Sequence, residues 1–181
     1  MTCTTAPYTP ERHVIGGLTD GRPLVLVPMT PEAAAVLAPE IAMFGPWAHY
    51  NIPAAALREG FSRTGDGAIR YQLLAGDTAA GVVVIRSPWL AGPYLQMLAV
   101  LPALQGRAIG SAVLDWYEAA AAGAQLRSVW LCVSEFNADA QRLYRRHGYA
   151  MAGVLPDMMR DGDDELLMRK SLVGRLKSSG G

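Results

Sequence analysis

Apolar and polar residues recur along the chain with two different periods, and these periods predict its secondary structure. Short runs rich in β-branched and apolar residues, bounded by Gly, Pro or Asp, are typical of strands. Apolar residues three and four positions apart indicate helices, and Thr30 followed by Pro31 marks one helix start. The expected strands span 24–27, 69–74, 80–86, 94–100, 128–133, 149–154 and 165–169. The expected helices span 31–44, 53–61, 110–122 and 137–146.

These elements alternate as β-α-α-β-β-β-α-β-α-β-β, which predicts a mixed α/β (α+β) fold. A chain of 181 residues suits one domain with a sizeable core. We expect a loose N-terminal segment over 1–20, a single domain over 21–172 and a flexible tail over 173–181. A turn at Gly76-Asp77 joins the second and third strands as a hairpin.

The composition is that of a compact globule, with 51% hydrophobic and 18% charged residues. Sixteen basic and sixteen acidic residues cancel, and no basic patch stands out, so nucleic acid is not an expected partner. Cys3 and Cys132 make no disulfide framework, which suits a reducing cytoplasm. The first residues do not resemble a signal peptide, and no apolar run reaches membrane-spanning length. We therefore expect a cytoplasmic protein without membrane contact.

A candidate phosphate site lies at Gln105 to Gly110, between a strand and a helix. The first N–H groups of a helix lack internal partners, and the helix dipole attracts anions there. Gly106 and Gly110 allow close approach of the backbone, and Arg107 adds a positive charge. The alternative is an ordinary strand-to-helix loop that uses glycine for its turn.

The helix that follows the strand 128–133 carries the second candidate group. Asn137 is a plausible N-cap, and Asn137, Ala140 and Tyr144 share one helix face. A phenol there can act as a proton donor. The alternative is that Tyr144 only packs in the core and that Asn137 only caps the helix.

Together these segments resemble the GNAT superfamily of acetyl-CoA-dependent N-acetyltransferases. The resemblance rests on Gln105-Gly106-Arg107-Ala108-Ile109-Gly110, on Leu98 to Pro102, and on Asn137 to Ala140 with Leu143-Tyr144 and Gly148-Tyr149. The sequence departs from the family pattern at Ala108, which stands at the position where the family usually has its first glycine. The resemblance implies a central mixed, mostly antiparallel sheet of about seven strands flanked by about four helices. It also implies that the strands 94–100 and 128–133 splay apart around coenzyme A.

The resemblance further implies a cofactor site and a mechanism, with acetyl-CoA as co-substrate and no metal. An amine attacks the thioester directly, a backbone N–H near Leu98 stabilises the oxyanion, and Tyr144 protonates the leaving thiolate. The residues expected to bind the cofactor are Leu98, Ala99, Val100, Gln105, Gly106, Arg107, Ala108, Ile109, Gly110, Ser111, Asn137 and Tyr144.

The general base is not determined by the sequence. Some relatives carry a glutamate at the position that aligns with Cys132, and a thiol replaces a carboxylate poorly. Glu135 is the nearest acid in the sequence and is our candidate, with a solvated loop carboxylate as the alternative. Histidine as a residue type is a common general base, so His49 is a further candidate. A chain of waters without a dedicated base is equally consistent with the sequence.

The acceptor is expected to be a primary amine of a small molecule or an amino acid, held by Trp47, His49, Tyr71 and Gln96. One alternative is a protein or peptide acetyltransferase acting on an N-terminus or a lysine. Another is a coenzyme A-binding sensor module without turnover. We also expect a homodimer, for which the apolar stretch Val154 to Met159 is one candidate surface; the same stretch could instead pack on its own sheet.

Overall fold

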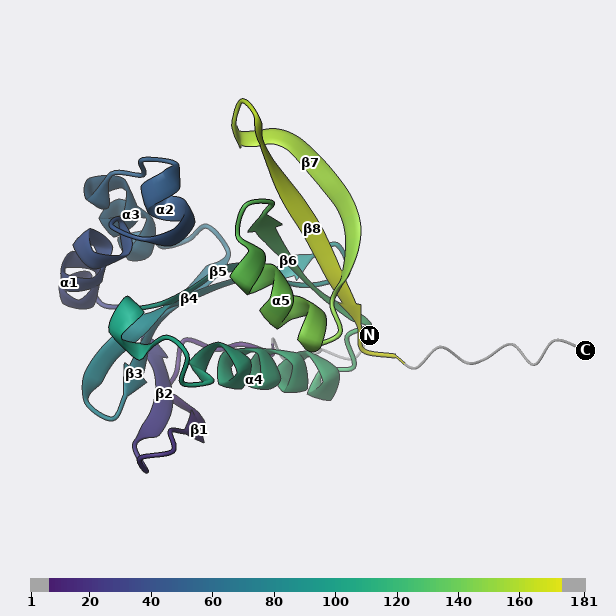
Figure 1. Ribbon diagram of the computed structural model, residues 1–181. Helices are drawn as coiled ribbons and strands as arrows, with labels where there is room; N and C mark the ends of the chain where they lie inside the picture. The colour runs from purple at the N-terminus through teal and green to yellow at the C-terminus, as the bar shows by residue number, and fades with distance from the viewer. Residues whose placement is uncertain (1–6, 174–181) are drawn as a thin grey trace, which may run out of the picture.

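The computed structural model describes residues 7–173 of the chain, in which helices lie on both faces of a sheet of eight strands (Figure 1). The strands are β1 (His13–Gly17), β2 (Pro23–Pro28), β3 (Ala68–Ala75), β4 (Thr78–Trp89), β5 (Gly92–Val100), β6 (Ser128–Ser134), β7 (Ala150–Arg160) and β8 (Asp163–Ser171). The helices are α1 (Pro31–Ile41), α2 (Gly45–His49), α3 (Ala54–Ser62), the 3-10 helix η1 (Pro102–Leu104), α4 (Ile109–Gly123) and α5 (Ala138–Arg146). Residues 1–6 of the expected loose segment and 174–181 of the expected tail lie outside the described residues.

All eight strands form one sheet in the order β1-β2-β3-β4-β5-β6-β8-β7. Every neighbouring pair is antiparallel except β5 and β6, which run parallel. The expected mixed, mostly antiparallel sheet is therefore confirmed, with one strand more than the sequence indicated. Among residues 7–173, no helix is long and apolar enough to cross a membrane.

The additional strand is β1, which lies within the segment 1–20 that we expected to be loose. It pairs with β2, with Val14 opposite Val25. Just before it, Tyr8 is buried and its hydroxyl donates to the carbonyl of Tyr117, 2.7 Å away. The prediction of a loose segment is wrong for this part of the chain, because two apolar residues followed by two glycines give too short a strand signal.

The hairpin around Gly76 is confirmed, but its second strand, β4, and the next strand, β5, are longer than predicted. Ala75 lies opposite Thr78 across the two-residue turn. β4 continues to Trp89, and β5 begins at Gly92, so most of residues 87–93, which lie between the two predicted strands 80–86 and 94–100, are also in strands. The last hairpin, β7–β8, is also long and rises away from the rest of the sheet (Figure 1).

The first predicted helix, 31–44, ends three residues early, and a short helix that the sequence did not predict, α2, follows it. Thr30 caps α1 as expected, since its hydroxyl accepts from the N–H of Ala33 at 3.2 Å. α1 ends at Ile41, and α2 begins at Gly45, whose φ of +58° interrupts the helical path. Pro46 then starts the new turn, because proline is well tolerated at the first positions of a helix.

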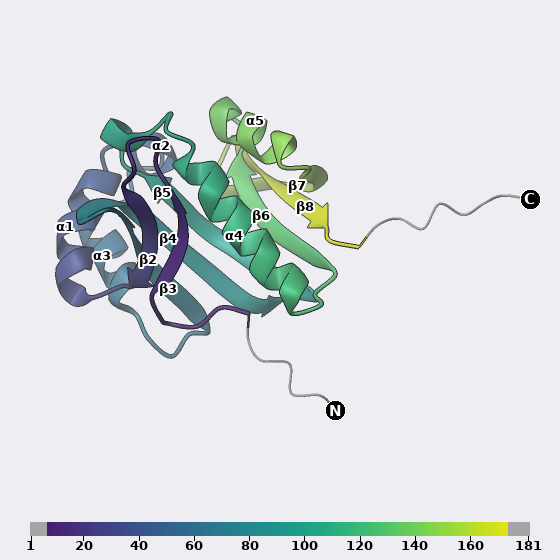
Figure 2. The same cartoon turned by 90° about the horizontal axis from the view of Figure 1, so that it is seen from below.

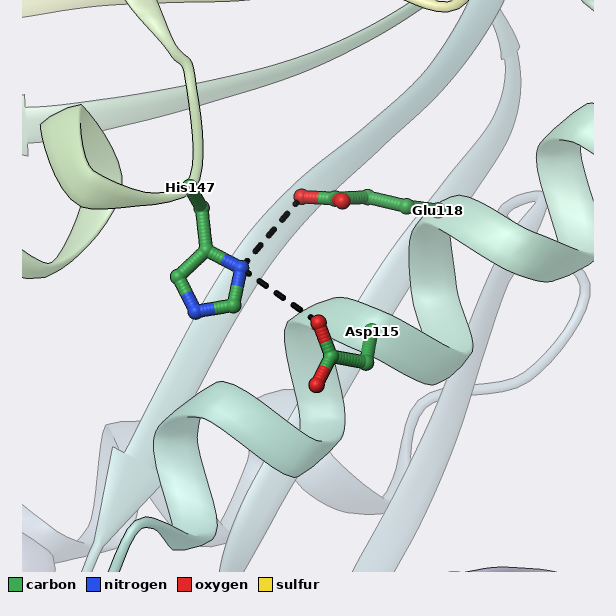
Figure 3. A group of neighbouring side chains, drawn as sticks. All are labelled: Asp115, Glu118 and His147. Atoms are coloured by element: carbon green, nitrogen blue, oxygen red, sulfur yellow. Dashed lines mark ion pairs between the residues drawn. The ribbon is translucent and has the colours of Figure 1, made fainter.

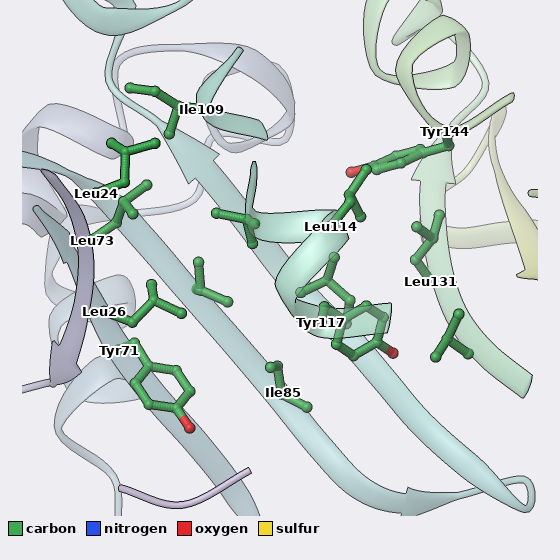
Figure 4. Close-up of a cluster of buried hydrophobic side chains, with 14 of the residues drawn as sticks. Leu24, Leu26, Tyr71, Leu73, Ile85, Ile109, Leu114, Tyr117, Leu131 and Tyr144 are labelled. Atoms are coloured by element: carbon green, nitrogen blue, oxygen red, sulfur yellow. The ribbon is translucent and has the colours of Figure 1, made fainter. Parts of the chain in front are cut away.

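Helices cover both faces of the sheet and give the molecule two cores. The first core contains Leu114 and Tyr117 of α4 and Tyr144 of α5, packed on strand residues such as Leu73 and Leu131 (Figure 4). Figure 2 shows α4 lying across this face of the sheet. The second core lies on the opposite face, against α1 and α3. Successive residues of β4 serve the two cores alternately, because side chains of a strand point to opposite faces.

Candidate active site

The parallel pair at the centre of the sheet is joined only at one end. Tyr94 lies opposite Trp130 and Leu95 opposite Leu131, and these are the two aligned pairs between β5 and β6. Beyond them β5 remains paired with β4, and β6 remains paired with β8. The strands therefore part after Leu95, as expected for this pair.

Local features of β5 explain why the strands meet and then separate. At the closed end, a Cβ on Gly92 would stand 2.1 Å from the carbonyl oxygen of Ser128, so only glycine allows this contact. Next along the strand, Gln96 forms a bulge, since consecutive residues of β4 face Leu95 and Met97. A bulge bends its strand, which turns β5 away from β6.

The gap between the strands is part of a cleft of about 1700 Å³. It extends from the start of α4 and one side of α5, past β5 and β6, to α2, α3 and the β7–β8 hairpin. One drug-sized ligand fills roughly 300–1,000 Å³. The cleft is therefore large enough to hold two reactants next to each other.

The N-terminus of α4 forms one end of the cleft. The N–H groups of Ile109, Gly110 and Ser111 precede the first intrahelical bond, which joins Ala112 N–H to the Ala108 carbonyl at 3.0 Å. No side chain among residues 7–173 caps this end. Free donors and the positive end of the helix dipole favour an anionic group here.

The loop before α4 is shaped by two residues with positive φ, Gly106 at +75° and Ala108 at +59°. Glycine adopts this region freely, whereas alanine does so at a cost. Gln105 braces the loop by donating from Nε2 to the Val100 carbonyl at 2.9 Å. Gly110 has a packing role as well, because a Cβ there would lie 3.0 Å from Leu143 of α5.

All but one of the residues expected to bind the cofactor line the cleft. Those that line it are Leu98, Ala99, Val100, Gln105, Gly106, Ala108, Ile109, Gly110, Ser111, Asn137 and Tyr144. Arg107 is the exception: its side chain is half exposed and approaches Asp20 at 3.9 Å. The expectation that Arg107 directs its charge into the site is not met by this side-chain position.

Tyr144 and Asn137 project from α5 on the other side of the cleft. Asn137 caps the helix as predicted, with its Oδ1 accepting from the N–H of Ala140 at 3.2 Å. Tyr144 is 8% exposed, and burial raises the pKa of its phenol to about 12. The phenol is therefore protonated at neutral pH and can serve as a donor.

Glu135, the predicted base, is not part of the cleft wall. Its side chain is exposed, on the loop between β6 and α5. Cys132 does line the cleft, but burial raises the pKa of its thiol, which keeps it neutral. A carboxylate that the sequence reasoning missed, Glu165 of β8, lines the cleft instead and is 7% exposed. The sequence shows Glu165 as the one acid of the predicted strand 165–169, at its first position, and we interpreted it only as the start of that strand.

Of the four residues expected to hold the acceptor, two line the cleft and two do not. Trp47 and Gln96 line the cleft. Tyr71 is fully buried in the core on the α4 face and donates to the carbonyl of Thr9 at 2.7 Å, so its assignment to the acceptor site is wrong. His49 is part of a neighbouring cluster rather than of the cleft wall.

That cluster joins α2 to the tip of the β7–β8 hairpin. The Nε2 atom of His49 lies 3.1 Å from Asp163 and 2.8 Å from the guanidinium of Arg160. The centre of the His49 ring lies 3.9 Å from that of Phe136, with the two planes tilted by 32°. Arg160 also contacts Asp163 at 2.6 Å. We call these four residues the clasp. It links α2 and the loop before α5 to the β7–β8 hairpin beside the cleft.

A second titratable cluster lies between α4 and α5, outside the cleft wall (Figure 3). The Nδ1 atom of His147 lies 3.6 Å from Asp115 and 3.8 Å from Glu118. Glu118 is also paired with Lys170 of β8. The ammonium group already neutralises the more buried carboxylate, so the cluster is explained as an ion-pair network between two helices and the sheet.

The comparisons with known proteins give the family of the chain. Residues 38–149, more than half of the chain, match the Acetyltransferase (GNAT) family. The chain belongs to this family of acetyltransferases. No curated protein matches the chain significantly.

Several solved structures share the fold at low sequence identity. The Ard1 protein from Thermoplasma volcanium has 17% identity and a TM-score of 0.66, over 83% of this chain and 99% of its own. The ribosomal-protein-S18-alanine N-acetyltransferase from Escherichia coli has 16% identity and a TM-score of 0.64, over 87% and 99%. An aminoglycoside 6'-N-acetyltransferase complexed with coenzyme A has 17% identity and a TM-score of 0.62, over 81% and 94%. At such identities the likeness concerns the fold alone.

Proposed function

We propose that the protein transfers an acetyl group from acetyl-CoA to a primary amine of a small molecule or an amino acid. One observation carries the proposal: a single cleft joins the free N-terminus of α4 and the phenol of Tyr144 to an aromatic wall at α2. The cleft has an anion-binding end at α4 and an aromatic end at α2, and the strands β5 and β6 part between them. The acyl donor and the amine acceptor could therefore bind at opposite ends and meet between the strands. The structural neighbour complexed with coenzyme A is consistent with this donor.

In this proposal the pyrophosphate of the coenzyme binds the N–H groups at the start of α4. The pantetheine arm runs along β5, whose edge beyond Leu95 has no β6 partner. A main-chain N–H near Leu98 then faces the thioester carbonyl. Such a donor stabilises the oxyanion of the tetrahedral intermediate and is commonly worth about 3 kcal/mol.

The shape of the acceptor end favours a small amine over a folded protein. The clasp holds the β7–β8 hairpin against α2, and Leu155, Met158 and Met159 of β7 line the cleft from that side. A peptide acceptor needs an open groove at the same place. We therefore expect free amines to be acetylated faster than the N-terminus of a peptide with the same first residue.

The first test is thermal unfolding with and without acetyl-CoA, with ATP as the phosphate control. A ligand at a hundred times its Kd adds about 2.7 kcal/mol of stability. For a domain of this size, that corresponds to a shift of roughly 5–10 °C in Tm. A shift with acetyl-CoA and little with ATP is expected, and no shift at millimolar acetyl-CoA would remove the donor from the proposal.

Turnover is followed as thiol release over a panel of amino acids, polyamines, aromatic amines and an aminoglycoside. Tyr144→Phe should lower kcat by roughly 10²- to 10⁴-fold, because it removes the proton donor for the leaving thiolate. The shift of Tm with acetyl-CoA should remain, since the ring is kept. The pKa of about 12 means that this donor is lost only as the pH rises through that value, so kcat should show no Tyr144-dependent fall below about pH 11.

Tyr149→Phe is the matched control. Its ring lies 6.0 Å from that of Tyr144, but it is not part of the cleft wall. Thiol release by this variant should equal that of the wild type. Unchanged turnover in Tyr144→Phe would exclude the acid role, and acetyl-CoA binding without thiol release across the panel would favour a sensor module.

A further inference from the structure

Three acids line the cleft, and their surroundings differ. Asp66 is bound by Arg70 and lies 3.3 Å from Arg86, and Asp139 is exposed and paired with Arg142. Glu165 has no ion pair among residues 7–173, although it is 7% exposed. A buried carboxylate without a positive partner is costly unless hydrogen bonds hold it, and such groups gather at functional sites.

Two hydroxyl groups hold Glu165 in place. Ser134 of β6, directly opposite in the strand register, donates from Oγ to Oε1 at 2.5 Å. Tyr50, just after α2, donates to the same oxygen at 2.8 Å. Burial first, and then the neighbouring Glu165, raise the pKa of Tyr50 to about 12, so this phenol remains a donor. The second carboxylate oxygen, Oε2, accepts no hydrogen bond from residues 7–173.

Glu165 lines the same cleft as the thiol of Cys132, and Tyr94 lines it as well. Burial raises the pKa of Cys132 and that of Tyr94, and the charge of Glu165 adds to both shifts, so the three groups share one part of the cleft. Cys132 stands on β6 where some relatives carry a glutamate. Glu165 reaches the same part of the cleft from β8, the strand that pairs with β6.

We propose that Glu165 is the general base of the reaction, with Ser134 and Tyr50 as the residues that position it. The inference rests on the proposed acetyl transfer. The acceptor arrives as an ammonium ion and gives one proton to Glu165. Its lone pair then forms the C–N bond with the thioester carbon, the C–S bond breaks with its electron pair on sulfur, and Tyr144 protonates that sulfur. As the amide forms, the nitrogen loses a second proton, which reaches Tyr144 through water and regenerates its phenol. Glu165 releases the proton it accepted to solvent.

Glu165→Gln tests the assignment with the smallest change of shape. The amide oxygen can still accept from Ser134 and Tyr50, but it takes no proton. With the amine that the wild type acetylates fastest, kcat/KM at pH 7 should fall roughly 10²- to 10⁴-fold. The loss should shrink as the pH rises, because the fraction of free amine grows. The Tm shift with acetyl-CoA should match that of the wild type.

Ser134→Ala provides a second, milder variant in case Glu165→Gln does not fold. It leaves the carboxylate and removes one of its two donors. The acidic limb of the kcat/KM profile should then move to higher pH, because the charged form has lost a hydrogen bond. A purely structural role for Ser134 would change the Tm without moving this limb.

Glu135→Gln makes the same chemical change on the exposed loop acid and should leave the profile unchanged. The base assignment is overturned if Glu165→Gln and Ser134→Ala keep the wild-type profile, or if Glu135→Gln shows the loss instead. A wild-type protein without amine-dependent thiol release would overturn the proposed function itself. That outcome is distinct, because it is seen before any variant is compared.

Discussion

Ala108 is the residue at which this chain departs from the glycine pattern, and it does so in the left-handed region, with φ +59° and ψ 12°. An L-residue in this region costs roughly 1–2 kcal/mol, and the greater freedom of glycine in the unfolded chain offsets about half of that. Ala108→Gly should therefore stabilise the protein by up to about 1 kcal/mol, or roughly 2–4 °C in Tm. Thermal unfolding checks the sign.

Ala119→Gly is the matched control for this change. Ala119 is exposed in the interior of α4 with ordinary helical geometry. The same substitution should there cost about 1 kcal/mol. If both variants lose stability, Ala108 is not strained in the folded protein.

At this scale the sequence predicted residues whose role follows from local geometry. Asn137 is the predicted cap, because capping depends on a few neighbouring residues. The positive φ of Gly106 was not predicted; the sequence indicated only that its backbone can be approached closely. The roles of Tyr71 and Glu165 depend on which face of a strand meets the cleft. That is set by the register of the whole sheet, which one short segment does not encode.

Gly92 governs the element that opens the cleft, the β5–β6 pair. A Cβ there would stand 2.1 Å from the Ser128 carbonyl oxygen, and the backbone cannot retreat without breaking the closed end. Gly92→Ala should destabilise the protein by roughly 3 kcal/mol or more, which is in the range of severe overpacking. Denaturant unfolding gives the value.

Gly123→Ala provides the comparison. Gly123 ends α4 with no positive φ, and a Cβ there meets nothing within 4 Å. This variant should be neutral or more stable by a few tenths of a kcal/mol. Equal stability of the two variants would mean that the closed end of the pair adapts freely.

The helices α3, α4 and α5 carry a clear helical period, and the sequence places them closely. The strands β4, β5, β7 and β8 extend beyond their predicted bounds. The five-residue elements β1 and α2 were missed, because their stability comes from contacts with distant parts of the chain. One of these misses matters for function, since α2 carries Trp47 and leads to Tyr50.

For the whole molecule, the clasp connects the two walls of the cleft. Although burial opposes ionisation, the bonds from His49 and Arg160 hold the pKa of Asp163 below its ordinary value. Its stabilising contribution is therefore present above the unfolded-state pKa and is lost as the pH falls through the lower folded value. Asp163→Asn should raise the KM for the amine severalfold and leave acetyl-CoA binding intact, as measured by steady-state kinetics and thermal shift.

The control for Asp163→Asn is Asp161→Asn, an exposed carboxylate in the same hairpin turn. It should leave both constants unchanged. A KM for the amine that does not respond to Asp163→Asn would show that the hairpin stays closed without the clasp. The homodimer remains a prediction at this scale, and part of its proposed surface, Leu155, Met158 and Met159, faces the cleft instead.

The parted strand pair has a consequence for the order in which the protein acquires activity. One side of the cleft, β1 to β5, is complete once the first 100 residues are made, whereas the other side ends with β8 at Ser171. Chains are synthesised from the N-terminus, so Glu165 on β8 leaves the ribosome after β1 to β5. A nascent or C-terminally shortened chain thus lacks the carboxylate as well as the strand that supports β6. On the proposed assignment of Glu165 as the base, acetyl transfer begins only after β8 has been synthesised.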